Sequence, residues 1–203
     1  MDETGKAVPR RLRDPAFAGR YFVGEGIDIG SGADNLGRYA YLFPGMTRVR
    51  GWDADDGDAT TMQGLAPESF DFVHSSHCLE HLMFPDHALG RWFRLVRPGG
   101  HLVVVVPDED MYEQGQFPVN LDHKCTFTLY KPRSWSPVSW NVLTLVTKLG
   151  PEAELLKAES LHYTYDWGAP PVDQTVGVAE SAIEFVVRKR PASEVAAGGR
   201  LRG

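Results

Sequence analysis

Residues 26–37 read GIDIGSGADNLG, a short run rich in β-branched residues that gives way abruptly to small ones. The run from Gly26 to Ile29 is typical of a buried strand, and the glycines after it let the backbone approach a ligand closely. The helix expected next, at about 35–42, offers unpaired amide hydrogens at the same point. The stretch therefore predicts a nucleotide-like ligand at the carboxyl end of a parallel strand.

The acid in this stretch, Asp28, narrows the choice of ligand. A carboxylate repels a pyrophosphate, but it suits a ligand with an ammonium group or ribose hydroxyls. A dinucleotide-binding loop would follow the pattern G-x-G-x-x-G/A, and Asn35 stands at its third glycine position. Both observations disfavour a nicotinamide cofactor.

Length and composition predict a single domain over 1–203. The chain has 203 residues, 42% of them hydrophobic, which is enough for one substantial core. Its formal net charge of −6 disfavours nucleic acid and anionic membranes as partners, because no overall positive field attracts polyanions. Two distant cysteines and no apolar leader predict a cytoplasmic location, and no apolar run is long enough to span a membrane.

Short β-type runs alternate with helical patterns, which is typical of βαβ units and a mostly parallel sheet. Both ends, about 1–13 and 191–203, are expected to be mobile, and the basic cluster at 10–13 to be a solvated face. The irregular stretch 108–136 is expected to cover a site. Strands are expected at 26–29, 48–52, 70–74, 101–106, 155–163 and 182–188, the last two as an antiparallel pair, and further helices at 85–95 and 138–149.

Polar motifs follow the next expected strands. Asp53 ends the second strand, where a carboxylate can accept hydrogen bonds from both ribose hydroxyls of an adenosine. Asp58 and Ala59 come shortly after it, where a side chain and a backbone amide could bind the edge of an adenine ring. The following strand ends in small polar residues within SFDFVHSSH at 69–77.

Together these motifs resemble those of the class I S-adenosylmethionine-dependent methyltransferases. The resemblance covers about residues 24–107, with DIGSG at 28–32, the acid at 53, GDA at 57–59, SFDFVHSSHCLEHL at 69–82 and LVRPGGHLVVVVP at 95–107. It implies a Rossmann-like, doubly wound α/β fold with seven mostly parallel strands and an antiparallel last strand, and S-adenosylmethionine as cofactor. Matching positions would bind it: Asp28, Gly30, Ser31 and Gly32 around the methionine moiety, Asp53 on the ribose, Asp58 and Ala59 at the adenine, and Ser75, Ser76 and His77 beside the sulfonium.

Two departures from the family pattern affect these assignments. Asp34 replaces the usual third glycine, so that either the loop is more restricted or Asp34 caps the helix that begins at Asn35. Only four residues separate Asp53 from Asp58, too few for the usual helix. Either that helix is missing, or Asp55 or Asp56 replaces Asp53 as the ribose acid.

Methyl transfer to a hydroxyl requires alignment of the reactants and removal of the hydroxyl proton. Histidine suits that step near neutral pH, and the candidates are His77, His81 and His123. His123 is the first choice, because it has an acidic neighbour, Asp122, and lies in the expected cover. Each histidine also has a structural interpretation, as a packing residue or a surface residue.

Two further clusters carry groups that could take part in chemistry. Glu80 and His81 could form a two-histidine, carboxylate metal site with Asp122 and His123. The favoured interpretation of Glu80 and His81 is that a helix begins there after the strand, so no metal is predicted. An acid run at 108–113 begins at a strand end, where one member could contact the methyl acceptor.

The sequence thus predicts a methyltransferase that acts on a small-molecule or glycan hydroxyl. Two alternatives stay open: a nicotinamide-dependent oxidoreductase, and a non-catalytic protein that binds S-adenosylmethionine. The identity of the acceptor, the choice among O-, N- and C-methylation, the base and the oligomeric state are not determined by the sequence.

Overall fold

The computed structural model describes residues 3–200. Two short strands, β5 (Thr126–Thr128) and β6 (Ser139–Asn141), form a separate parallel pair outside the main sheet. The main sheet consists of β1 (Gly24–Ile29), β2 (Met46–Trp52), β3 (Phe70–Ser76), β4 (Val96–Pro107), β7 (Ala153–Leu161) and β8 (Ala182–Lys189).

The strand order in the main sheet is β2-β1-β3-β4-β8-β7. The first four strands are parallel, and β8 runs antiparallel to both of its neighbours. This topology confirms the Rossmann-like α/β class and the antiparallel pair at the end of the chain. The prediction of seven strands is wrong, because six strands form the main sheet within residues 3–200.

The stretch between β2 and β3 lacks regular structure. Residues 53–69 contain turns and no helix or strand. This segment contains four Asp and two Gly, which favour turns over regular structure. Of the two alternatives left open for this stretch, the missing helix is therefore confirmed.

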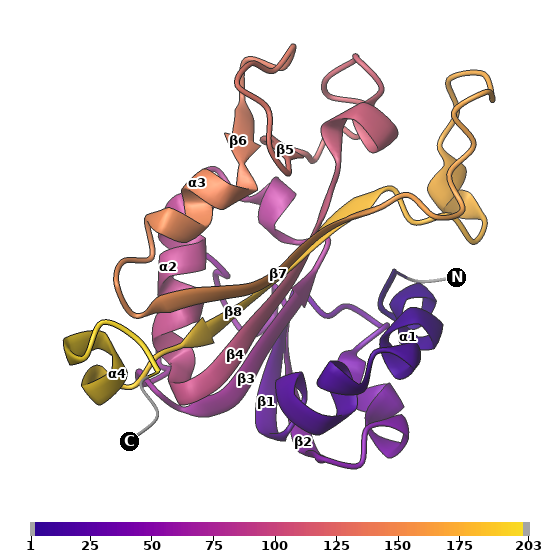
Figure 1. Cartoon of the computed structure of the whole chain (residues 1–203). Helices are drawn as coiled ribbons and strands as arrows, with labels where there is room; N and C mark the ends of the chain where they lie inside the picture. Colours follow the sequence, from indigo (N-terminus) through magenta and orange to yellow (C-terminus); the bar gives the residue numbers. More distant parts are fainter. Residues whose placement is uncertain (1–2, 201–203) are drawn as a thin grey trace.

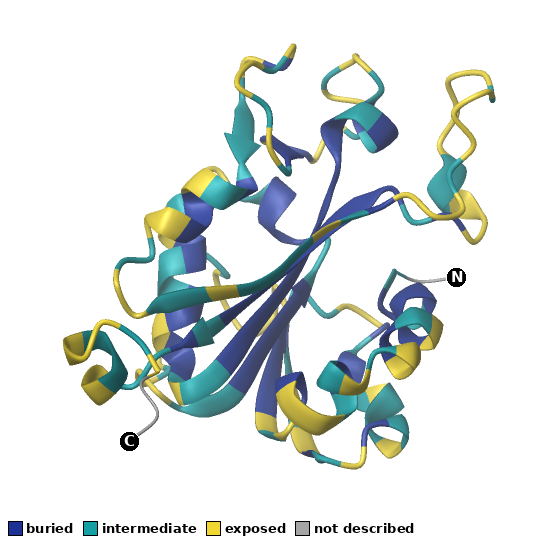
Figure 2. Cartoon of the chain, viewed as in Figure 1, coloured by how far each residue is buried: buried dark blue, intermediate teal, exposed yellow. Residues whose placement is uncertain are grey.

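Helices cover both faces of the sheet (Figure 1). The sheet's two faces belong to different cores: in β4, Leu102 and Val104 pack with α2 on one face, while Val103 packs on the other. Figure 2 shows that the central strands are largely buried. The α-helices are α1 (Glu3–Arg13), α2 (Pro85–Leu95), α3 (Val142–Thr147) and α4 (Ala192–Ala196), and shorter helical turns are η1 (Phe17–Tyr21), η2 (Leu36–Leu42), η3 (Leu79–His81), η4 (Glu109–Glu113) and η5 (Gln174–Val176).

The N-terminal segment corrects a prediction. Residues 3–13, expected to be mobile, form α1, and Arg11 of its basic cluster is fully buried. The Arg11 guanidinium donates from Nε to Glu184 Oε2 on β8 at 3.0 Å, so that a buried acid holds the helix on the sheet. At the other end, 192–196 form α4. Residues 1–2 and 201–203 of the expected mobile ends lie outside the described residues.

The helix expected at 138–149 begins later, at Val142. The preceding residues form β6 and pair with β5, and the side chain of Asn141 accepts a hydrogen bond from the amide of Thr144 at 3.0 Å. That cap fixes the helix start at the end of the strand. Among residues 3–200, no helix combines the length and apolarity that crossing a membrane requires.

Candidate active site

Three cavities adjoin one another at the carboxyl ends of β1, β2 and β3. We name them the Asp53 cavity (about 320 Å³), the Gly32 cavity (about 250 Å³) and the His123 cavity (about 180 Å³). Gly30 lines both of the first two. Glu3 and His77 line both the Gly32 and the His123 cavity. The three cavities therefore form one row along the strand ends, where sheets of this kind bind ligands.

The glycine loop turns sharply at the junction of the first two cavities. Gly30 and Gly32 have positive φ angles of 70° and 49°, which other residues rarely adopt. A Cβ atom at residue 30 would lie 2.5 Å from the Cβ of Cys78, closer than atoms can pack. Glycine is thus required at residue 30 by both conformation and space.

Asp28 does not line any of these cavities. It is 1% exposed; its Oδ2 accepts a hydrogen bond from the amide of Leu36 at 2.7 Å, and its Oδ1 lies 2.5 Å from His74 Nδ1. Ser75 is also buried and donates its hydroxyl to the carbonyl of Ile29 at 2.9 Å. We therefore correct the predicted cofactor contacts of Asp28 and Ser75 to a supporting role, in which they hold the glycine loop and the strand ends.

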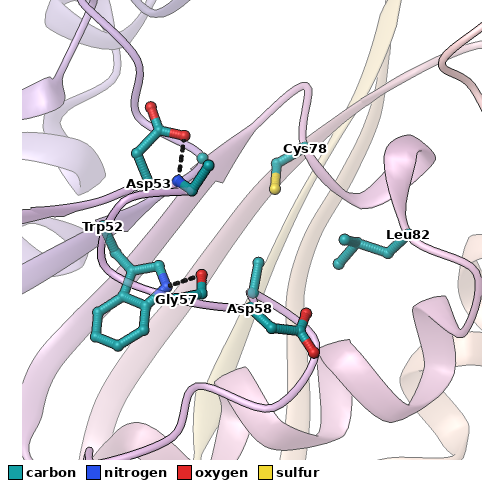
Figure 3. Close-up of a pocket in the computed structure, with 9 residues that line it drawn as sticks. Trp52, Asp53, Gly57, Asp58, Cys78 and Leu82 are labelled. Carbon is teal, nitrogen blue, oxygen red and sulfur yellow. Dashed lines mark hydrogen bonds between the residues drawn. The ribbon is translucent and has the colours of Figure 1, made fainter.

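The Asp53 cavity brings together three of the predicted residues: Asp53, Asp58 and Ala59. Asp53 Oδ2 accepts from the amide of Gly32 and Oδ1 from the amide of Ala54, both at 2.8 Å. The indole of Trp52 donates to the carbonyl of Gly57 at 3.1 Å and keeps the turn folded (Figure 3). The carboxylate of Asp53 is thereby held beside the glycine loop.

The structure also distinguishes among the acids after β2. Asp56 accepts from the amide of Asp53 at 3.0 Å and does not line the Asp53 cavity, and neither does Asp55. Asp53 is therefore the ribose-acid candidate that the geometry favours.

Sequence reasoning missed Cys78 and Leu82. They face Asp58 across the cavity (Figure 3) and give the cavity an apolar side. Burial raises the pKa of the Cys78 thiol to about 12, so it remains protonated.

Ser31, Gly32, Ser76 and His77, predicted to lie near the methionine end of the cofactor, line the Gly32 cavity. Sequence reasoning missed Glu3 and Thr4 of α1, because it treated that segment as mobile. His77 has a positive φ of 53°, unusual outside glycine and frequent at functional sites. Its Nδ1 lies 3.1 Å from Ser76 Oγ, and its Nε2 lies 4.0 Å from Glu3 Oε2.

The His123 cavity contains all three candidate histidines. Nδ1 of His123 lies 2.6 Å from Oε1 of Glu113, and the ring of Tyr112 stacks on His123 at 5.2 Å. His123 therefore has an acidic partner, but it is Glu113 of the acid run and not the adjacent Asp122. Tyr112 and His123 both come from 108–136, so the expected cover does contribute walls to this cavity.

Burial shifts the ionisation of several groups here. It lowers the pKa of His77 to about 3 and that of His81 below its usual value, so both rings are uncharged near neutral pH. Burial raises the pKa of Glu80 to about 8, and the neighbouring acids Glu113 and Glu3 contribute to the rise. The cavity thus combines neutral imidazoles with a carboxyl group that resists ionisation.

The family of the chain follows from its sequence. It matches the family model of the methyltransferase domain over residues 9–140, well over half of its length, and the chain belongs to that family. A comparison with curated proteins finds no match.

Solved structures share the fold. A structure of the Haloferax volcanii Trm112 methyltransferase activator with its methyltransferase aligns with a TM-score of 0.63, at 15% identity over 94% of this chain and 92% of that chain. An Archaeoglobus fulgidus SAM-dependent methyltransferase aligns at 0.57, with 17% identity over 92% and 94%. Burkholderia thailandensis 1,6-didemethyltoxoflavin-N1-methyltransferase, solved with 1,6-didemethyltoxoflavin and S-adenosylhomocysteine, aligns at 0.57, with 15% identity over 93% and 80%.

The chain thus belongs to the methyltransferase family, and it shares its fold with S-adenosylmethionine-dependent methyltransferases of known structure, as predicted. The residues present fit S-adenosylmethionine as a cofactor. The tight glycine loop leaves room beside the strand ends, Asp53 offers a carboxylate for ribose hydroxyls, and Trp52 and Leu82 give the Asp53 cavity apolar walls for a ring.

Proposed function

We propose that this methyltransferase transfers the methyl group to a hydroxyl of a small molecule or glycan bound in the His123 cavity. The observation that carries the proposal is the order of the cavities. The Asp53 and Gly32 cavities share Gly30, and the Gly32 and His123 cavities share His77 and Glu3. A cofactor extended through the first two would end beside the wall of the third.

In this proposal the residues that line each cavity have defined roles. Asp53 binds the ribose hydroxyls, and Asp58 and Ala59 bind the adenine. Ser31, Gly32 and Ser76 surround the methionine moiety, next to His77. When bound, S-adenosylmethionine supplies an electrophilic methyl group on a cationic sulfur. The chain must then align the acceptor oxygen with that methyl group and receive the hydroxyl proton.

Geometry favours His77 as the proton acceptor. Of the three candidate histidines, it is the one on the wall between the Gly32 and His123 cavities. Burial lowers the pKa of its ring to about 3, so His77 is uncharged near neutral pH but a weak base, and it needs a nearby acid to hold the proton. The carboxyl group of Glu3, 4.0 Å from Nε2, can stabilise the ring once it is protonated. His81 and His123 also line the His123 cavity, which would hold the methyl acceptor.

The test is transfer of a labelled methyl group. The protein is incubated with radiolabelled-methyl S-adenosylmethionine and either fractionated cell extract or a panel of sugars and phenols. We expect a methyl ether as product. Label on nitrogen or carbon would overturn the hydroxyl assignment. A protein that binds the cofactor but labels no fraction would be the non-catalytic alternative, and a thermal shift with NADH alone would support the oxidoreductase.

Variants test the assignments within the site. We expect Asp53→Ala to weaken cofactor binding by at least about tenfold in calorimetry, since a pair of hydroxyl hydrogen bonds is lost. The matched control is Asp55→Ala, which removes an exposed acid outside the cavities. We expect His77→Ala to slow turnover far more than it weakens cofactor binding. Parent-like turnover in His77→Ala would remove His77 from the mechanism.

A further inference from the structure

Glu80 is a buried carboxyl group without a hydrogen-bond partner. It is 1% exposed, and neither of its side-chain oxygens has such a partner in the part of the chain that the structure describes. Leaving a buried polar group unpaired is costly, and the cost is greatest for a charge. Glu80 lines the His123 cavity, so the missing partner can come from a bound ligand.

Two imidazoles face the same point. The available ligand atoms of Glu80, His81 and His123 all lie within 4.8 Å of one another, and His81 Nε2 is 3.8 Å from Glu80 Oε1. Ligand atoms around a tetrahedral zinc ion, bound at about 2.0–2.2 Å, are about 3.3–3.5 Å apart. Small side-chain rotations would therefore bring the three atoms to binding distance.

Both histidines are oriented as metal ligands usually are. Nδ1 of His123 lies 2.6 Å from Oε1 of Glu113, and Nδ1 of His81 lies 3.3 Å from the carbonyl oxygen of Asp122. Each ring then carries its proton on Nδ1 and keeps the lone pair of Nε2 available. Such outer partners fix the ring orientation in metal sites and increase the basicity of the ligating nitrogen.

We propose that Glu80, His81 and His123 bind one divalent transition-metal ion of the zinc type. Two imidazoles and one carboxylate suit such ions, whereas calcium and magnesium prefer oxygen ligands. Asp122, which the sequence suggested as the carboxylate ligand, instead contributes its carbonyl oxygen to orient His81.

Three protein ligands leave a fourth position open, and the His123 cavity offers about 180 Å³ around it. A ligand oxygen bound there would have a lowered pKa. This role rests on the proposed function: the acceptor hydroxyl would bind the metal ion and lose its proton more readily. His77, which lines the same cavity, would receive that proton.

Metal binding is tested directly on protein without a histidine tag. The protein is treated with a chelator, desalted and titrated with Zn²⁺ in a calorimeter, and with Co²⁺ while its visible absorption is recorded. We expect one ion per chain and the absorption of tetrahedral cobalt. Glu80→Gln and His123→Ala should each weaken binding at least about 100-fold, and Glu113→Gln about 10- to 100-fold through the lost orientation of His123.

The control is His162→Ala, which removes an exposed histidine far along the chain from the site. Its metal affinity should equal that of the parent. Absence of one-to-one binding in the parent, or equal affinity in the parent and Glu80→Gln, would overturn the proposal. Circular dichroism checks the fold of each variant; if His123→Ala does not fold, Glu80→Gln, which keeps the side-chain shape, carries the test.

The two proposals fail independently. Cofactor binding is measured by calorimetry on the metal-free protein, and metal binding is measured without cofactor. A protein that binds Zn²⁺ at these residues but methylates no hydroxyl keeps the metal site and loses the proposed acceptor. A protein that methylates a hydroxyl at the same rate with and without chelator, and binds no metal, keeps the function and loses the site.

Discussion

Asp28 and Glu80 are equally buried, each 1% exposed, and have opposite surroundings. Asp28 has Leu36 N at 2.7 Å and His74 Nδ1 at 2.5 Å. Neither side-chain oxygen of Glu80 has a hydrogen-bond partner among residues 3–200. A buried acid with hydrogen-bond partners stabilises the fold, whereas a buried acid without them indicates a position where a ligand can bind.

The hydrogen bonds of Asp28 belong to a network on the face of the sheet that α1 covers. His74 Nε2 lies 3.1 Å from Arg11 Nη1, and a guanidinium can only donate. Nε2 therefore accepts, which leaves the ring proton on Nδ1 to be donated to Asp28. Arg11 also donates to Glu184 at 3.0 Å. These contacts connect β1, β3, α1 and β8, and so they connect the N-terminal helix to the support of the glycine loop.

Among substitutions in the network around Asp28, we expect Arg11→Met to have the largest effect on stability. It leaves the Nε2 of His74 without its partner and removes one of the cations around the buried carboxylate of Glu184, which keeps Arg10 and Lys157, so we expect the free energy of unfolding to fall by about 3–4 kcal/mol. Urea denaturation measures the change. Arg13→Met, at an exposed position of the same helix, is the control and should change stability by less than about 0.5 kcal/mol. A similar small loss in Arg11→Met would show that the network is not a structural unit.

Acid should weaken the same network. Burial alone would raise the pKa of Glu184, but the charges of Arg11 and Arg10 outweigh it and lower the pKa to about 2, from an ordinary value of 4.5. Its stabilisation is therefore complete above about pH 4.5 and is lost as the pH falls toward 2. We expect a loss of roughly 3 kcal/mol by about pH 2, at about 1.4 kcal/mol per pKa unit.

The measurement for this prediction is denaturant unfolding of the parent and of Glu184→Gln between about pH 6 and pH 2. A protonated carboxyl group resembles the amide, so the stability difference between the two proteins should shrink toward zero as the pH falls. A difference that does not depend on pH would contradict the role assigned to the charge of Glu184.

The smallest effect on stability is expected at Glu80. Glu80→Gln removes a buried charge that has no hydrogen-bond partner among the described residues, so the metal-free protein should gain about 1 kcal/mol of stability at about pH 8 or above. Added Zn²⁺ should raise the melting temperature of the parent but not of the variant. A stability loss of more than about 1 kcal/mol in the metal-free variant would mean that Glu80 is structural, as Asp28 is.

The fold was predictable where neighbouring residues decide the structure. The apolar run of β4 and the apolar face of α2 predicted the sheet and its covering helix. Turn-forming residues between Asp53 and Ser69 gave too little pattern to decide whether a helix is present there. The periodicity of the sequence indicated six strands, and the prediction of seven came from the family resemblance.

The site was predictable only in part. Asp53, Asp58, Ser31 and His77 line neighbouring cavities, because strand ends of a parallel sheet converge at one edge. Their contacts with the cofactor stay a prediction. The sequence could not show that Glu113, ten residues away, is the partner of His123. It also could not show that α1 packs on the sheet, because a cluster of arginines suggests a solvated face unless the buried acid that pairs with it is known.

The sequence by itself determined the class of fold, the family and the position of the tight glycine loop, since these depend on local periodicity and on backbone conformations that only glycine adopts readily. Tertiary structure alone decided which buried acids have partners. Asp28 and Glu80 are both acids close to predicted strand ends, and only long-range contacts separate their roles: Asp28 meets His74, whereas Glu80 has no hydrogen-bond partner among the described residues. The physical reason is that the cost of burying a charge depends on what surrounds it in space, and that environment is assembled from distant parts of the chain.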